Sequence, residues 1–292
     1  MIITVWGSRG SIPTPGAGTV KYGGNTSCVT ARLDDIFIIL DAGTGIRVFG
    51  EYLIQTGAPF VGHLFFSHMH SDHIQGFPFF GPAYMPGNVL NIYEHEDIVA
   101  GFGGHFNYGM KSPNFPVDMK EMGADIRLFS MTEPVEIKSR GAVLATVRHA
   151  TLNHPDPTLG YRIKDARSGK TFVYASDTEH FPGKVDENLA RLARGADVLL
   201  YDAQYTEEEY YGLNGKPPKK GWGHSTWKEG LKMASASQAR HLLLSHHDPG
   251  HDDKTQAAIE HEAKRYLEEN RSLLPGVGLV EMAYEGLIID LD

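Results

Sequence analysis

Short runs of apolar residues, each ended by Gly, Pro, Asp or Asn, dominate the chain and predict β-strands. In the first half they are Ile2–Val5, Ser27–Leu33, Ile36–Leu40 and His63–Phe66. In the second half they are Ala142–Val147, Gly160–Ile163, Thr171–Ala175, Val198–Tyr201 and His241–Ser245, with Leu279–Met282 and Leu287–Ile289 as a closing pair. Many strands with few clean strand–helix–strand units favour a mixed α/β sandwich over a doubly wound sheet.

Helical patterns are fewer. They predict a helical segment after His73 and helices at Asp186–Leu192, Lys228–Ala236 and Lys254–Leu267, the last with Asp252 or Asp253 as its N-cap. No repeat or linker separates two complete patterns, so we expect a single domain over residues 1–292. The segment Gly101–Met122 follows neither period and is rich in Gly, Pro and aromatic residues. This composition suits either a lid over a site or an irregular surface excursion.

Composition narrows the class of protein. Hydrophobic residues make up 41% and charged residues 22% of the chain, which is ordinary for a globular protein. The net charge of −9 argues against a protein that binds by neutralising a long phosphate backbone. Cys28 is the only cysteine, so no disulfide forms within the chain and thiolate-rich metal sites are excluded. Since the sequence also shows neither a basic, apolar leader nor a long apolar run, we expect a cytoplasmic protein that does not enter a membrane.

Histidine is unusually frequent, at 15 residues, and it clusters. His68, His70, Asp72 and His73 lie within six positions, directly after the predicted strand that ends near Phe66. The chain must turn tightly there for these side chains to converge. A protein with almost no thiol builds a metal site from imidazole and carboxylate, and such sites accept Zn²⁺, Mn²⁺ or Fe²⁺.

This His-x-His-x-Asp-His motif is similar to the signature of the metallo-β-lactamase superfamily, in the phosphodiesterase branch that includes ribonuclease Z and cyclic-nucleotide phosphodiesterases. Further positions match in order: Asp41 after a strand, Asn153-His154, Ser176-Asp177 and Ser245-His246. The resemblance runs from about Ile2 to His251. It implies a four-layered αββα sandwich with two mixed sheets and a metal-dependent hydrolase.

The resemblance also implies a set of metal ligands. One cation would be held by His68, His70 and His154, and the other by Asp72, His73 and His246, with Asp177 as the bridge. We expect two divalent cations, Zn²⁺ first, with Mn²⁺ or Fe²⁺ as alternatives. His149 also ends a strand run and competes with His154. The remaining candidates, His63, His247 and His251, are expected to support ligands, cap elements or lie on the surface.

Two later segments resemble catalytic elements of ribonuclease Z: the run ending Tyr201-Asp202-Ala203-Gln204, and Gly223-His224-Ser225-Thr226. The resemblance makes His224 the general acid and Asp202 its orienting partner, with Asp in place of the family's Glu. Asp72 is counted both as a ligand and as a catalytic residue. We expect a metal-bridging hydroxide to attack a phosphodiester while His224 protonates the leaving oxygen. Ser225 or Thr226 also suits a helix N-cap.

The substrate prediction rests on a short segment. Bacterial ribonuclease Z carries an RNA-gripping arm between the positions that match His154 and Asp177, whereas here strands and a turn at Asp165–Gly169 fill that interval. We therefore favour a small phosphodiester such as a cyclic nucleotide over a structured RNA. The alternatives are a transfer RNA 3′ endoribonuclease of the ribonuclease Z type, an acyl hydrolase (lactonase, thioesterase or β-lactamase), and a non-catalytic protein that keeps the metals as a clamp.

Several nearby features are consistent either with substrate binding or with a purely structural role. The glycine-rich stretches Gly7–Pro13 and Gly23–Cys28 offer backbone N–H groups to a phosphate, or simply turn between strands. Nearby aromatic side chains suit either stacking on a base or packing in the core, and nearby lysines suit either a phosphate contact or a solvated loop; these residues are Phe77, Phe79, Phe80, Lys216, Lys219 and Lys220. Members of the family are often dimers, which leaves a homodimer open.

Overall fold

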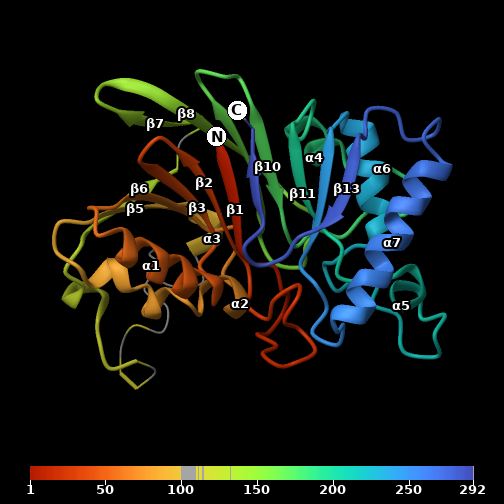
Figure 1. Cartoon of the computed structure of the whole chain (residues 1–292), viewed down its shortest axis with the longest axis horizontal. Coiled ribbons are helices and arrows are strands. Elements are labelled where there is room, and N and C mark those ends of the chain that lie inside the picture. Colours follow the sequence, from red (N-terminus) through yellow and green to blue (C-terminus); the bar gives the residue numbers. More distant parts are fainter. Residues whose placement is uncertain (100–109, 111, 114, 132, 292) are drawn as a thin grey trace.

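The computed structural model describes residues 1–99, 110, 112–113, 115–131 and 133–291. In this part of the chain the strands form two seven-stranded sheets. The sheets face each other at the centre of the molecule, with α1 and α2 outside one of them and α4, α6 and α7 outside the other (Figure 1). The predicted four-layered αββα sandwich with two mixed sheets is therefore confirmed.

The first sheet has the order β14-β1-β2-β3-β4-β5-β6. Its strands are β1 (Ile2–Gly7), β2 (Cys28–Leu33), β3 (Ile36–Leu40), β4 (Val61–Phe65), β5 (Val89–Glu94), β6 (Asp125–Ser130) and β14 (Ile288–Asp290). The pairs from β14 to β3 are antiparallel, and those from β3 to β6 are parallel. The closing strand β14 thus brings the C-terminal region beside the N-terminal strand (Figure 1).

The second sheet repeats this plan in the order β13-β12-β11-β10-β9-β8-β7. Its strands are β7 (Val135–Ser139), β8 (Ala142–Thr151), β9 (Leu159–Asp165), β10 (Thr171–Ala175), β11 (Val198–Asp202), β12 (His241–Ser245) and β13 (Leu279–Met282). The pairs from β7 to β10 are antiparallel, and those from β10 to β13 are parallel. Each sheet therefore has a parallel part whose strands end at a common edge.

The main core lies between the sheets. Strand β1 shows how the sequence builds it, because its residues alternate between half-buried and buried, with Ile3 and Val5 at 0% exposure. These side chains belong to the same cluster as Ile38 from the first sheet and Ile163 and Leu200 from the second. Burying both inner faces holds the sheets in a fixed relation, which in turn fixes the distance between their strand ends.

Helices cover the two outer faces. α1 (Gly45–Thr56) packs on the first sheet, together with 3-10 turns at Phe77–Phe79 and Gly81–Tyr84. α4 (Glu187–Leu192), α6 (Trp227–Ser237) and α7 (Asp253–Glu269) pack on the second sheet, and α5 (Glu207–Tyr211) lies near them. The N-caps of α6 and α7 are Thr226 and Asp252, each accepting a hydrogen bond from a backbone N–H, as the sequence predicted.

Two predictions about the region after the histidine motif fare differently. The helical segment expected after His73 is present as two short 3-10 helices, which contain Pro78 and Pro82, while α2 (Ser71–Ile74) ends one residue after His73. The candidate lid at 101–122 includes residues 101–109, 111 and 114, which lie outside the described residues. Residue 100, directly after α3 (Glu96–Val99), also lies outside them. Within the described residues, no helix is both long and apolar enough to span a bilayer.

Candidate metal centre

The site lies where five parallel strands end. Strands β3 and β4 of one sheet and β10, β11 and β12 of the other lead directly into Asp41, the His68–His73 loop, Asp177, Asp202 and His246. Asp41, Asp177 and His246 have positive φ angles of 61°, 56° and 63°. Non-glycine residues seldom adopt this left-handed conformation, and it is found preferentially at functional sites. It turns each of these chain segments sharply as it leaves its strand.

Asp72, His73, Asp177 and His246 form one tight group of buried ligand atoms. The Nε2 atoms of His73 and His246 lie 3.4 Å apart, and each is 3.3 Å from Oδ2 of Asp72. Each is also 3.1 Å from an oxygen of Asp177. Donors bound at about 2.0–2.1 Å around a tetrahedral cation lie about 3.3 Å apart, so this group has the spacing of a ligand set.

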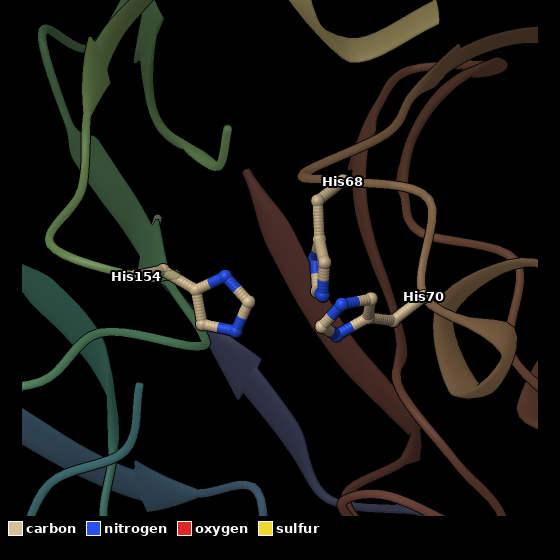
Figure 2. Close-up of side chains that lie close together, drawn as sticks. All are labelled: His68, His70 and His154. Carbon is tan, nitrogen blue, oxygen red and sulfur yellow. The ribbon is translucent and has the colours of Figure 1, made fainter. Parts of the chain in front are cut away.

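A second group consists of His68, His70 and His154, whose ring nitrogens gather within 4.8 Å of one another. Figure 2 shows the three rings pointing toward one another, His154 from one side and the other two from the facing loop. The ring centroids are 4.4 to 5.0 Å apart. Nε2 of His68 lies 3.8 Å from Oδ1 of Asp177, so Asp177 stands between the two groups.

His149 does not join either group. It lies inside strand β8, paired with Tyr161, and its ring contacts His95 at 5.1 Å. Strand β8 continues to Thr151, and the loop that follows it carries His154 to the site. Of the two competing histidines, the structure therefore brings His154 to the cluster.

The Asp41 carboxylate orients His73. It is completely buried and accepts hydrogen bonds from the Ser67 N–H (2.6 Å), the Ser67 hydroxyl (2.8 Å) and the Tyr174 hydroxyl (2.7 Å). Its Oδ2 also lies 2.7 Å from Nδ1 of His73. This contact leaves Nε2 of His73 directed at the group of ligand atoms. A carboxylate behind a histidine is a common arrangement in metal sites, because it fixes the ring and its tautomer.

The other rings are anchored in the same way through Nδ1. His246 contacts Oε1 of Gln204 at 2.9 Å, and His154 contacts the Thr158 hydroxyl at 3.0 Å. Nδ1 of His68 lies 3.0 Å from the Ser67 hydroxyl, while its buried Nε2 has no hydrogen-bond partner among the described residues. A buried polar atom without a partner is costly, and a cation at this point would satisfy it.

His70 is the exposed member of its group. Its Nε2 lies 2.7 Å from Oδ2 of Asp156, so Nδ1 is the nitrogen left for a metal ion. Asp156 follows His154 closely in the chain and links the two sides of the site. The donor set of imidazoles and carboxylates therefore fits a pair of divalent cations, with the anchoring groups already in place.

The electrostatics of the buried groups also suit cations. Burial lowers the pKa of His68 well below its usual value. Burial alone would lower the pKa of His246 too, but Asp177, Asp72 and Asp202 raise it to about 9. Burial favours the protonated form of Asp177, yet the charges of His246, His73 and His68 hold its pKa well below the ordinary range. Carboxylates beside His73 and His246 favour the protonated form of these two rings in the metal-free protein, and bound cations would take the place of those protons.

His224 and Asp202 stand beside the second group. Nδ1 of His224 lies 2.8 Å from Oδ2 of Asp202, and the His224 ring stacks on His246 with centroids 4.7 Å apart. Oδ1 of Asp202 accepts hydrogen bonds from the N–H groups of Gln204 (3.0 Å) and Ser225 (3.2 Å). The shorter Asp side chain therefore reaches the histidine, and the structure brings these two predicted residues together.

A cavity of about 270 Å³ connects these groups; it is lined by Ser11, His70, Ser71, Asp72, Asp177, His224 and His246. The N-terminal glycine-rich stretch forms one wall. The Ser11 N–H donates to Oδ2 of Asp72 (2.7 Å), and a Cβ atom on Gly10 would lie 2.4 Å from the His246 ring. This stretch therefore packs against two of the predicted ligands, and glycine is needed at position 10 for that close approach.

The other candidates have structural positions. Phe77 and Phe80 are buried in the core beneath α1, while Phe79 is 60% exposed. Lys216 and Lys220 are exposed, as expected of a solvated loop, and Lys219 lies over the Trp222 ring. The three remaining histidines are buried and contact Tyr93, the Ala283 carbonyl and Glu209; they are His63, His247 and His251, respectively.

Sequence reasoning overlooked four residues that orient the site. Gln204, Tyr174 and Thr158 hold His246, Asp41 and His154, and Glu179 contacts the segment before His224. Gln204 and Glu179 each lie two residues after a predicted site residue, and this proximity was the available signal. Tyr174 and Thr158 carry no such signal, since they belong to strand-rich segments that read only as core.

Comparison with known proteins identifies the family of this chain. A family model described as the beta-lactamase superfamily domain matches residues 37–247, so the chain belongs to this superfamily. An uncharacterized protein of Mycobacterium leprae is 31% identical over 85% of this chain and 78% of its own length. A ribonuclease Z of Haloarcula marismortui is 24% identical over 84% of this chain and 86% of its own.

Among solved structures, the metallo-β-lactamase fold protein YhfI of Bacillus subtilis superposes with a TM-score of 0.68 at 18% identity, over 99% of this chain and 98% of its own. This likeness shows the fold. Together with the family match and the histidine and aspartate groups, it defines a metal-dependent hydrolase of the metallo-β-lactamase superfamily, in the branch that contains ribonuclease Z and phosphodiesterases.

Proposed function

We propose that this chain is a dinuclear phosphodiesterase that hydrolyses a small or cyclic nucleotide phosphodiester. The observation that carries the proposal is the His224–Asp202 pair, 2.8 Å apart, in the same cavity as the predicted ligands. An ester of an alkoxide has a poor leaving group, so a positioned acid is valuable there. An acyl substrate with a better leaving group, such as the thiolate of a thioester, has less need of it.

In this proposal His68, His70 and His154 hold one cation, and Asp72, His73 and His246 hold the other, with Asp177 shared between them. Zn²⁺ is the preferred ion because the donors are mostly imidazoles and their separations match a tetrahedral site. When bound, such a pair supplies a water molecule that ionises near neutral pH and positive charge beside the phosphoryl oxygens.

The protein's own groups account for the remaining work. The Asp202 carboxylate fixes the His224 ring through Nδ1, which leaves Nε2 to hand a proton to the departing oxygen. Asp72, held by the Ser11 N–H, keeps its position in the cavity wall while the substrate enters. The buried ring of His246, stacked on His224, keeps the acid close to the ligand group.

The preference for a small substrate rests on the short hairpin between His154 and Asp177, two of the predicted metal ligands. The interval from His154 to Asp177 holds β9, a tight turn in which Asp165 accepts from the Arg167 N–H (2.8 Å), and β10. The cavity itself measures about 270 Å³, near the lower end of the roughly 300–1,000 Å³ usual for small-molecule sites. A small substrate would bind in such a cavity without the arm that ribonuclease Z uses to hold a folded RNA.

The test combines a substrate panel with an acid-deficient variant. Purified protein is assayed on 2′,3′- and 3′,5′-cyclic nucleotides, a chromogenic diester and precursor transfer RNA, before and after chelation and with Zn²⁺ or Mn²⁺ restored. We expect turnover of the small diesters, loss with chelator and recovery with metal. A protein that binds both metals but turns over no phosphodiester would contradict the proposal, and a non-catalytic clamp would explain it.

The role of the acid is tested by leaving group. His224→Ala lowers kcat by about 10²–10⁴ on a diester with an alkoxide leaving group, and far less on one that releases 4-nitrophenolate. The matched control is His261→Ala, because His261 is exposed on α7 and belongs to neither group of predicted ligands. Equal losses on both substrates would remove the acid role.

A second candidate, a transfer RNA 3′ endoribonuclease, is favoured by the relative named ribonuclease Z at 24% identity. The same panel separates the two. Cleavage of precursor transfer RNA at its 3′ end, with no turnover of cyclic nucleotides, would establish the endoribonuclease instead.

A further inference from the structure

Glu179 is a buried carboxylate two residues after Asp177, and its backbone is tied to the segment that carries His154. The Glu179 N–H donates to the Asn153 carbonyl (2.8 Å), and the Asn153 side-chain amide donates back to the Glu179 carbonyl (2.8 Å). Only 9% of Glu179 is exposed. Two of the predicted ligands are therefore flanked by one pair of reciprocal hydrogen bonds.

The Glu179 side chain reaches a third segment, the one that leads into His224. Its Oε2 accepts from the N–H groups of Gly223 (3.0 Å) and Gly221 (3.1 Å). Its Oε1 accepts from the Gly221 N–H (2.8 Å) and from the Tyr210 hydroxyl (2.5 Å). All these donors are neutral, and hydrogen bonds to an ionised carboxylate are about twice as strong as neutral ones.

The next residue in the chain contacts the other side of His224. Nδ1 of His180 lies 2.9 Å from the Ser225 hydroxyl, which in turn contacts the Tyr201 hydroxyl at 3.1 Å. Glu179 thus holds the residue before His224, and His180 holds the residue after it. The loop that follows Asp177 encloses the backbone of His224 from both sides.

The Gly223 backbone has little freedom to move without disturbing the site. Its φ is +88°, and a Cβ atom there would lie 2.3 Å from the His154 ring and 2.6 Å from Pro155. The segment before His224 is therefore in van der Waals contact with a predicted metal ligand. A shift of Gly223 would move the His224 ring relative to that ligand.

We propose that Glu179 is a positioning residue that fixes His224, the general acid of the proposed function, relative to the two groups of predicted metal ligands. The inference rests on the proposed phosphodiesterase function and deepens it. Glu179 is not among the residues that line the cavity beside the predicted ligands. It acts through Gly221 and Gly223, so that the Nε2 of His224 meets the leaving oxygen at the distance that proton transfer requires.

The first test is Glu179→Gln. In either orientation, the amide turns its NH₂ group toward a backbone N–H or a hydroxyl from which the carboxylate oxygen accepts a hydrogen bond. We expect kcat to fall by about 10-fold to 100-fold on a diester with an alkoxide leaving group, and by less than about 2-fold on one that releases 4-nitrophenolate. An equal loss on both substrates would show a general structural effect and overturn the proposal.

The matched control is Glu209→Gln. Glu209 is also a carboxylate that accepts a backbone N–H in the same region, but its partners are Thr206 and His251 rather than the His224 segment. Its replacement should leave both rates unchanged. Placing Glu179→Gln in a His224→Ala background is more decisive, because a residue that acts through His224 has no further effect once the ring is gone. A loss of the same size in both backgrounds would refute the inference.

A readout without turnover separates this inference from the proposed function. Hydrogen exchange of the Gly221 and Gly223 amides should be at least about 10-fold faster in Glu179→Gln, and the NMR signal of the His224 Nδ1 proton should shift or broaden. If no phosphodiester is hydrolysed yet these signals change, the proposed function fails while the positioning contact stands. If hydrogen exchange of these amides and the His224 signal were both unchanged, the positioning contact of Glu179 would be refuted.

A milder variant guards against a misfolded protein. Tyr210→Phe removes only the hydroxyl that donates to Glu179 and leaves the buried ring in place. We expect the same dependence on leaving group, at about 2-fold to 5-fold, since a single hydrogen bond is lost. A Tyr210→Phe enzyme that folds and slows equally on both diesters would count against Glu179 acting through His224.

Discussion

Asp41 offers the sharpest test of how the site is held together, through the substitution Asp41→Asn. Three donors surround Oδ2, namely the Ser67 hydroxyl, the Tyr174 hydroxyl and Nδ1 of His73, and the Ser67 N–H donates to Oδ1. An asparagine offers one carbonyl oxygen and an NH₂ group. If its NH₂ replaces Oδ1, it opposes the Ser67 N–H. If it replaces Oδ2, His73 is driven toward the tautomer that protonates Nε2.

The magnitude follows from these contacts. One buried donor left unpaired costs about 1–3 kcal/mol, and hydrogen bonds to an ionised group are worth about 1.5–3 kcal/mol each. We therefore expect the free energy of unfolding to fall by about 2–5 kcal/mol. Metal affinity should fall by about 10-fold to 100-fold, the usual effect of removing the partner of a metal-binding histidine.

The assays are urea unfolding of metal-free protein and competition for Zn²⁺ with a chromophoric chelator. Asp165→Asn is the matched control, because Asp165 is also buried and accepts hydrogen bonds in a turn, yet lies at the far end of the β9–β10 hairpin. It should lose stability without losing metal affinity. An Asp41→Asn protein that binds Zn²⁺ as tightly as the wild type would refute the reasoning that His73 is oriented by Asp41.

Three further predictions follow from single features. Burial opposes the charged form of His246, but Asp177, Asp72 and Asp202 together raise its pKa to about 9 in the metal-free protein, so Zn²⁺ binding at pH 7 should release protons and tighten as pH rises. Calorimetry in two buffers of different ionisation enthalpy measures this release, and a heat independent of buffer would contradict it. Although burial favours the protonated form of Glu209, its hydrogen bonds to His251 and Thr206 lower its pKa from 4.5 to about 2, so its stabilisation is present above pH 4.5 and is lost as pH falls toward 2. The stability gap between wild type and Glu209→Gln, from thermal unfolding at a series of pH values, should shrink over that range; a constant gap would be inconsistent. Gly223→Ala should lower Zn²⁺ affinity and activity together, since the new Cβ meets the His154 ring and φ is +88°; unchanged metal content and rate would show that the segment can move freely.

The fold was largely predictable where apolar runs are short and cleanly bounded. Strands β3, β10 and β12 match their predicted ranges, and the capped helix α7 begins and ends within two residues of its prediction. Helix α1 was missed although Ile46, Phe49 and Leu53 are buried at helical spacing. It follows the glycine-rich turn after Asp41 and contains glycine, which obscured its period.

Strands β5, β6 and β7 were also missed. Strand β6 is largely exposed along Asp125–Ser130, so it lacks the apolar alternation that marks a half-buried strand. It pairs in parallel with β5, and this long-range pairing supplies the stability that its own sequence does not indicate. The apolar pattern of a segment does not predict a strand where pairing with a neighbouring strand supplies most of its stability.

The competition between His149 and His154 shows the same limit within the site. Both follow the start of an apolar run, and no local feature tells whether the strand ends before or after residue 149. The antiparallel register of β8 with β9 continues through His149 paired with Tyr161 to Thr151 paired with Leu159. That register, set by two strands together, leaves His154 at the sheet edge.

The amino-acid sequence by itself determined which chemical groups stand at the strand ends: imidazoles and carboxylates at His68–His73, Asp177 and His246, and an acid candidate at His224. This is legible because parallel strands of a sheet end at one edge, so residues that follow them meet. Only the tertiary structure decided which nitrogen of each ring faces inward. That choice depends on Asp41, Gln204 and other partners far away in the chain, which approach the rings only when the two sheets have packed on their common core.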